Sequence, residues 1–104
     1  MVNPYTGEVA LVIDGERKVL KLTLGALAEL EAVLETDSLV ALVQRFETGD
    51  YSSRDVLALI VAGLRGGGYA ITASDLLSAD LEGGPIKAAQ VAAELLARAF
   101  MVPE

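Results

Sequence analysis

Nine consecutive residues without a charged or hydrogen-bonding side chain, 56–64, constrain the fold more than any other stretch of the sequence. Ser52 stands shortly before this run, and Arg65 and a run of glycines follow it, which is the usual pattern at the start and end of a helix. The apolar positions that share one side at helical spacing are Leu57, Ile60, Val61 and Leu64. Because other apolar residues cover much of the opposite side, the helix must be enclosed on most of its faces. At about three turns it is too short to span a bilayer. We predict a central helix over 53–65.

The composition indicates one domain over 1–104 with an aliphatic core. The chain has 104 residues, of which 53% are hydrophobic and only 5% aromatic, and this length is near the commonest domain size. Cysteine and histidine are both absent. Their absence excludes disulfides, zinc sites with the usual ligands, and cysteine or histidine catalysis. We therefore expect no metal and no cofactor.

The charge is acidic and dispersed. Eight basic and fifteen acidic residues give a formal net charge of −7, which favours solubility. Lysine and arginine are not clustered, so no nucleic-acid partner is expected. We expect neither a secretory leader nor a membrane-spanning segment, and the expected location is the cytoplasm.

Two alternating runs on either side of Asp14 and Gly15 predict an antiparallel hairpin over about 7–24. An Asp-Gly pair is the strongest short hairpin signal, because both turn residues adopt positive φ. A two-residue turn pairs the strands in a definite register, which places Ile13 opposite Glu16, Leu11 opposite Lys18, and Val9 opposite Leu20. The face predicted to be buried consists of Val9, Leu11, Leu20 and Leu22.

The other face of the hairpin carries the candidate partner-binding residues, Val12, Val19 and Lys21. A two-stranded hairpin is marginal alone and must pack on helices or on another subunit. We expect both of its edges to be unpaired, which favours pairing with a neighbouring chain. Self-association through the hairpin is therefore a further expectation.

Helical patterns follow the hairpin to the end of the chain. Thr23 or Gly25 is expected to cap the first helix, and Asp37 or Ser38 is expected to cap the second. Asp75 completes a capping box with Thr72, and Pro85 suits the first position of the last helix. The predicted helices span about 25–35, 38–47, 53–65, 73–81 and 85–101. The predicted fold class is α+β, an N-terminal hairpin followed by a bundle of four to five helices.

Two features could carry chemistry, and each has a simpler structural interpretation. Gly66, Gly67 and Gly68 could cradle a phosphate, but they follow a helix and lack the lysine and hydroxyl residue of a P-loop. A helix end followed by a flexible turn explains them better. Glu31 and Glu35 are one helical turn apart and could form an acid–base pair. A solvated helix face explains them better, so no catalytic residue is assigned.

Two stretches resemble a known family. They are Gly7-Glu8-Val9-Ala10-Leu11 with Ile13-Asp14-Gly15 and Leu22-Thr23-Leu24-Gly25-Ala26-Leu27-Ala28-Glu29-Leu30-Glu31, and Asp55-Val56-Leu57-Ala58 running to Ala62-Gly63-Leu64-Arg65-Gly66-Gly67-Gly68. Together they resemble the small tail-assembly protein encoded among the tail genes of gene transfer agents and related prophages. That family is described either as a tail assembly chaperone or as a tail tube protein.

The resemblance implies a non-enzymatic role in building a phage-type tail. The first expectation is a chaperone that binds the tape measure protein in the host cytoplasm while tube subunits assemble around it. The alternative is a structural component that stays in the finished particle, with tail tube subunits as partners. A small nucleotide-binding or enzymatic domain is a distant alternative. The resemblance carries no active site over to this sequence.

Overall fold

The computed structural model of this chain describes residues 7–34 and 38–100 and begins with the predicted hairpin. Strand β1 (Val9–Ile13) pairs antiparallel with β2 (Glu16–Leu20). The turn residues Asp14 and Gly15 have φ of 52° and 80°, as a two-residue hairpin turn requires. The predicted register is confirmed, with Ile13 opposite Glu16 and Val9 opposite Leu20.

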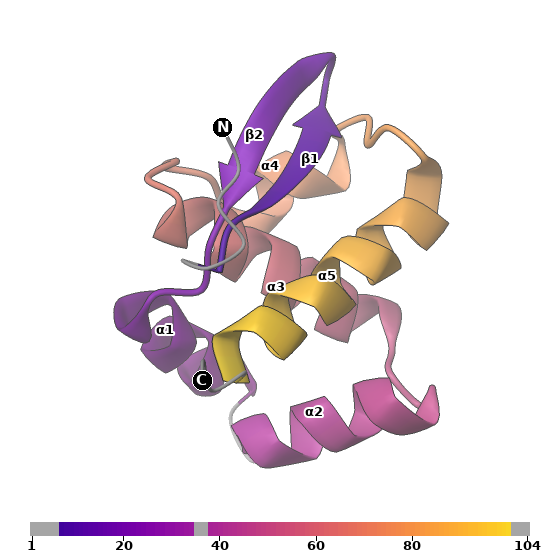
Figure 1. The fold of residues 1–104 in the computed structure, drawn as a ribbon. Helices are drawn as coiled ribbons and strands as arrows, with labels where there is room; N and C mark the ends of the chain where they lie inside the picture. The colour runs from indigo at the N-terminus through magenta and orange to yellow at the C-terminus, as the bar shows by residue number, and fades with distance from the viewer. Residues whose placement is uncertain (1–6, 35–37, 101–104) are drawn as a thin grey trace.

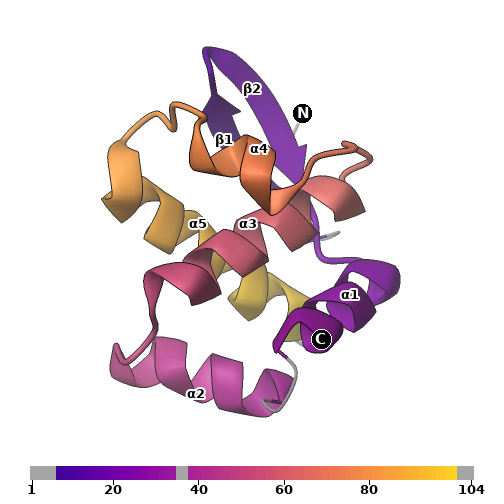
Figure 2. The ribbon, with the colours of Figure 1, turned by 180° about the vertical axis from the view of Figure 1, so that it is seen from behind.

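Five helices follow the hairpin (Figures 1 and 2). They are α1 (Leu24–Leu34), α2 (Leu39–Thr48), α3 (Ser53–Gly66), α4 (Ala73–Leu77) and α5 (Gly84–Phe100). The predicted α+β class is therefore confirmed. Most boundaries fall within one residue of the prediction, and the predicted ends at positions 35 and 101 lie outside the described residues.

Helix α3 is the centre of the fold. It packs against β2, α1, α4 and α5, and Figure 1 shows it behind α5 with the hairpin above. Every residue from 56 to 64 is buried or half-buried, so the expected enclosure of this run is confirmed. Leu59, Ile60 and Leu64 are at most 1% exposed. Leu57 and Val61, expected on the core side, are only half-buried.

Local capping explains where three of the helices begin. The Ala26 amide donates to Thr23 Oγ1 at 3.1 Å, so Thr23 rather than Gly25 caps α1. Ser38 caps α2 by accepting from the Ala41 amide. Ser52 caps α3 in a capping box with Asp55. Each cap satisfies an amide that has no partner inside the helix.

Helix α4 is shorter than predicted. The expected helix over 73–81 ends at Leu77, because the chain beyond it pairs with the edge of β1. The Asp14 amide donates to the Asp80 carbonyl at 2.8 Å, and the Glu82 amide donates to the Val12 carbonyl at 3.0 Å. Leu81 forms an antiparallel bridge with Ile13. Tertiary pairing therefore replaces the last helical turn.

The expectation that both hairpin edges are unpaired is wrong. The segment 80–82 engages β1, as described above, and the end of α3 engages β2. The Lys21 amide donates to the Gly63 carbonyl at 2.9 Å, and the Val19 amide donates to the Tyr69 hydroxyl at 3.4 Å. The chain thus uses its own segments at both edges, which limits strand addition by a neighbour.

The glycine run ends α3 and allows it to touch the hairpin. The Tyr69 amide donates to the Leu64 carbonyl and the Gly68 amide to the Arg65 carbonyl, and Gly68 has φ of 99°. These bonds form a Schellman motif. A Cβ on Gly66 would lie 1.9 Å from the Lys21 carbonyl oxygen, and one on Gly67 would lie 2.2 Å from that of Val19. Close backbone approach, not flexibility, accounts for these two glycines.

Candidate functional site

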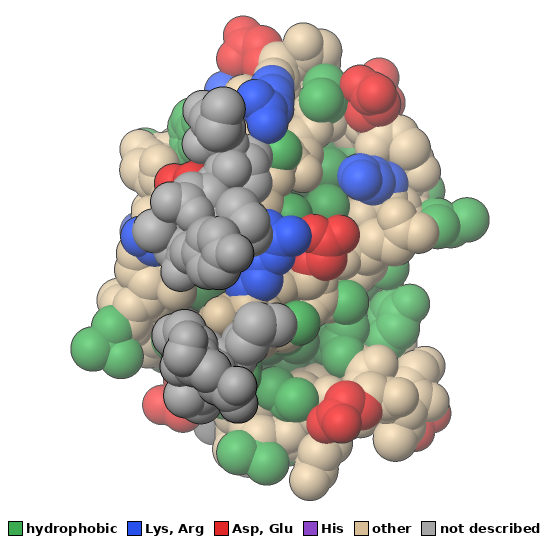
Figure 3. Space-filling view, viewed as in Figure 1, with side chains coloured by type: hydrophobic (Ala, Val, Ile, Leu, Met, Phe, Trp, Pro, Cys, Tyr) green, Lys and Arg blue, Asp and Glu red, His purple; other side chains and the backbone are tan. Residues whose placement is uncertain are grey.

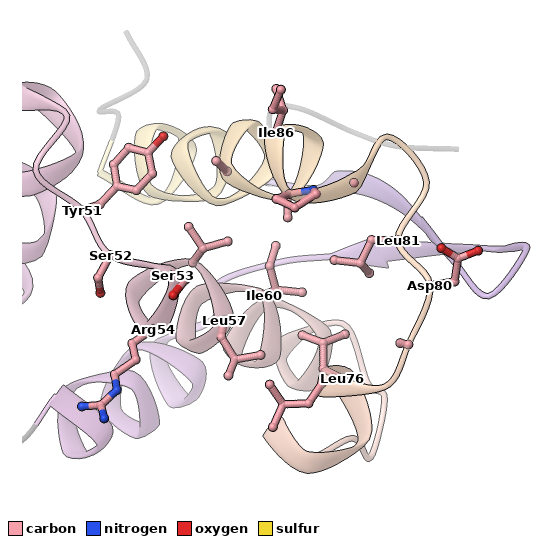
Figure 4. Close-up of a pocket in the computed structure, with 17 residues that line it drawn as sticks. Tyr51, Ser52, Ser53, Arg54, Leu57, Ile60, Leu76, Asp80, Leu81 and Ile86 are labelled. Atoms are coloured by element: carbon pink, nitrogen blue, oxygen red, sulfur yellow. The ribbon is translucent and has the colours of Figure 1, made fainter.

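An apolar groove lies between the first half of α3, helix α4 and the start of α5. Its volume is about 910 Å³. In Figure 4, Leu57 and Ile60 from α3, Leu76 from α4, and Leu81 lie between the helices. The remaining lining residues are Tyr51, Ser52, Ser53, Arg54, Val56, Leu77, Ala79, Asp80, Gly84, Pro85, Ile86, Ala88 and Ala89. Apolar side chains therefore form most of this surface.

The walls of the groove are held by contacts close along the chain. Tyr51 stacks on Phe46 with ring centroids 4.4 Å apart and 8° between the planes, which fixes the turn before α3. Thr72 and Asp75 form a capping box that starts α4. At the start of α5, Pro85 occupies the first turn, where a missing amide hydrogen has little cost. Contacts between residues that are close together in the sequence thus shape the walls of the groove.

Two oppositely charged side chains mark the ends of the groove. Arg54 lies at one end and Asp80 at the other (Figure 4). Arg54 forms no ion pair with any residue within 7–34 or 38–100. Helix α5 has no acidic residue in its first turn, so the partial positive charge of its N-terminus is not offset there.

A partly buried ion pair anchors α2 to α3 beside the groove. The Arg45 guanidinium donates to both carboxylate oxygens of Asp55 at 3.0 Å, and Asp55 is 7% exposed. Burial, the largest single influence, raises the pKa of Asp55. The hydrogen bonds from Arg45 and Ser52 together outweigh it, so the pKa lies below the ordinary value of 3.8.

The Asp55→Asn variant is expected to lose about 1.5–3 kcal/mol of unfolding free energy at neutral pH, because it removes charged hydrogen bonds. A lowered carboxyl pKa stabilises the fold above the unfolded-state value and stops doing so as the pH falls through the folded-state value. The difference between wild type and variant should therefore shrink as the pH falls below 3.8. Urea denaturation at pH 7 and pH 3 measures it. An equal difference at both pH values would contradict the assignment.

Because apolar side chains form most of its lining, the groove is suited to binding an apolar surface.

Among the described residues, no group of three or more acidic side chains could hold a metal ion. Charged side chains of both signs are interspersed over the face seen in Figure 3. In the described part of the chain, no helix combines the length and apolarity needed to cross a membrane.

The glycine run does not form a phosphate site. The amides of Gly67, Gly68 and Tyr69 all donate to carbonyls of α3. They are therefore turned back into the helix and cannot cradle an anion. The interpretation of this run as a helix end is confirmed.

The partner residues predicted from sequence lie on the hairpin, apart from the groove. Val12, Val19 and Lys21 are half-buried, and the backbone of each bonds to another part of the chain. Val12 stands opposite Arg17, and Val19 opposite Ala10, on the hairpin face opposite the buried one. The structure leaves their side chains half-buried, and none of the three lines the groove.

Sequence reasoning missed the exposed residues at the groove. Leu77 is 73% exposed and Ile86 is 74% exposed, and neither was among the residues predicted to bind a partner. A signal was present in the sequence. Adjacent residues of a helix point in different directions, so Leu76 and Leu77 cannot both face the protein core. Ile86 follows directly after Pro85 in the first turn of α5.

Comparison with known proteins identifies the family. Neither the curated proteins nor the solved structures yielded a match. The family model described as "phage tail tube protein, GTA-gp10" matches residues 6–102. This match spans nearly the whole chain and agrees with the resemblance noted in the hairpin and in α3. The chain belongs to the GTA-gp10 family of phage tail tube proteins.

Proposed function

We propose that this chain is a structural component of a phage-type tail that remains in the finished particle. The family description carries the proposal, since it names a tail tube protein and matches residues 6–102. It favours the component, which was the alternative in the sequence analysis, over the chaperone. The proposed partners are other tail subunits, met in the host cytoplasm during assembly, and no catalytic step is involved.

The surface of the described residues supports a role in protein contact. An apolar groove of about 910 Å³ with exposed Leu77 and Ile86 at its margin is the kind of feature that marks interaction sites. The acidic chain, with a net charge of −7, stays soluble before assembly.

A chaperone that binds the tape measure protein is the second candidate, and one observation favours it. The described residues contain a single two-stranded sheet, whereas tube subunits usually close a ring with a larger sheet. In that case the hairpin residues Val12, Val19 and Lys21 are proposed to contact the partner.

Sedimentation of tails distinguishes the two candidates. Cells producing particles are lysed, intact tails are pelleted through a sucrose cushion, and the tagged chain is followed by immunoblotting. A structural component is expected in the pellet and should resist a high-salt wash. A chaperone is expected to stay in the supernatant with unassembled tape measure protein, and that result would reject the proposal. A tagged cytoplasmic protein of the host serves as the control for trapping.

A further inference from the structure

Helix α2 is packed more loosely than α1, α3 and α5. It lies at the edge of the molecule, on the side away from the hairpin (Figures 1 and 2). Among the described residues, the closely packed pairs of elements join α3 to α1, β2, α4 and α5, and β1 to β2 and α5. None of these pairs includes α2. A single residue of α2, Leu42, is buried, and elements with so few buried contacts open most readily.

The seam between α2 and the rest of the chain is incompletely filled. Leu39, Val43 and Phe46 face the core but are only half-buried. A crevice of about 390 Å³ opens between α1, α2, the loop that follows α2, and the start of α3. Side chains that line an empty space lose packing contacts on that side. The apolar attachment of α2 therefore depends mainly on Leu42.

The ion pair between Arg45 and Asp55 crosses this seam. The Arg45 guanidinium donates to both carboxylate oxygens at 3.0 Å, and both side chains line the crevice. Removing one partner of a buried pair is costly because the other charge is left without a partner. Asp55, however, also accepts from the Ser52 amide at 2.9 Å, and departure of α2 would admit water to its other side. The pair can therefore break without leaving a buried, unpaired charge.

The backbone of α2 is independent of its neighbours. Among the described residues, the backbone hydrogen bonds of 38–50 all stay within that segment. Ser38 caps the start of α2, and Gly49, with φ of 80°, caps its end. Helix α3 has a separate cap in Ser52. Helix α2 can therefore leave without breaking a backbone hydrogen bond of α3.

We infer that α2 undocks as a unit while the hairpin and the other four helices stay folded, and that the pair of Arg45 with Asp55 holds it closed. Undocking uncovers Leu42 and the part of the core that it covers. Helix α2 has ten residues, and a helix of that length is marginal in water, so it unravels once it has undocked. The inference concerns a movement within one chain and does not depend on the proposed function.

Thiol labelling tests the inference, because the chain has no cysteine of its own. Leu42→Cys places a thiol on α2 and Leu64→Cys places one on α3, at positions that are both 0% exposed. Urea denaturation gives the global unfolding constant of each variant, and an aromatic disulfide reagent measures thiol exposure under native conditions. Leu64→Cys should react at the rate that its unfolding constant predicts. Leu42→Cys should react at least about tenfold faster than its own constant predicts.

The urea dependence of labelling distinguishes local from global opening. Undocking of α2 exposes less surface than unfolding of the whole chain, so the rate for Leu42→Cys should rise less steeply with urea. A dependence as steep as that of global unfolding would overturn the inference. Labelling of Leu42→Cys at the rate expected from its global unfolding constant would also overturn it.

Arg45→Met in the Leu42→Cys background tests the role of the ion pair. Loss of the hydrogen bonds to Asp55 should increase labelling at least about tenfold. Arg65→Met is the matched control, because it makes the same charge change and removes the exposed pair with Glu29. Exposed pairs contribute little, so labelling should change by no more than about twofold. Equal effects of the two substitutions would show that the pair with Asp55 does not hold α2 closed.

Hydrogen exchange of the unsubstituted chain tests the same opening without any cysteine variant. After correction for intrinsic rates, the hydrogen-bonded amides of α2 should exchange together, at least about tenfold faster than those of 59–64 in α3. Nuclear magnetic resonance follows each amide separately. Equal protection of the two helices would contradict the undocking of α2.

Discussion

Gly66→Ala is expected to lower the unfolding free energy by at least about 2 kcal/mol, as overpacking against a rigid neighbour does. The new Cβ would lie 1.9 Å from the Lys21 carbonyl oxygen and 3.2 Å from the Ala26 Cβ. The first contact is to backbone, which no side-chain rotation can relieve. The end of α3 and β2 would have to separate, breaking the bond between the Lys21 amide and the Gly63 carbonyl.

Gly25→Ala is the matched control and should have the opposite sign. Gly25 lies within α1, and its nearest neighbour to an added Cβ is Thr23 Oγ1 at 3.9 Å. With ordinary space and no positive φ, alanine should stabilise the fold by about 0.4–1 kcal/mol. Urea denaturation followed by circular dichroism measures both variants. Equal effects at the two positions would mean that α3 does not contact β2 as described.

Ile60→Asp is expected to abolish the cooperative thermal transition. Ile60 is 1% exposed in the middle of α3, and among the described residues the one buried charged side chain is Asp55, which is itself acidic. A carboxylate buried without a partner costs several kcal/mol, so the loss should exceed about 4 kcal/mol and approach the whole stability of a small domain.

Leu77→Asp makes the same chemical change at an exposed position of the same groove. Its side chain is 73% exposed, so the stability should change by no more than about 0.5 kcal/mol. Differential scanning calorimetry of the two variants provides the comparison. A normal transition for Ile60→Asp would show that α3 is not enclosed and would contradict the burial of Ile60.

The parts of the fold that follow from local chemistry could be predicted from the sequence. Asp14 and Gly15 determine a two-residue turn, and that turn sets the strand register. Ser52 and Asp55 define the start of α3 in the same way, because a capping box satisfies amides within one turn. The enclosure of 56–64 follows from its composition alone.

The parts that depend on contacts between distant segments could not be predicted. Nothing near Leu81 in the sequence shows that its backbone pairs with Ile13, so α4 was expected to run on. The pairing of Asp55 with Arg45 joins two helices across a loop and has no signature at either residue. The groove forms between three helices, α3, α4 and α5, so no single stretch of sequence indicates it. The hairpin can be predicted from one stretch, and the candidate binding residues were therefore placed there.

The measurement that tests the central claim most directly is the number of copies of this chain in each finished particle. Purified particles are digested with added isotope-labelled peptides from this chain and from another tail protein, and both are quantified by mass spectrometry. A structural component is predicted to be present in a fixed stoichiometric ratio to the other tail protein. Trace amounts in particles, with abundant peptide in the lysate from which they came, would contradict the account.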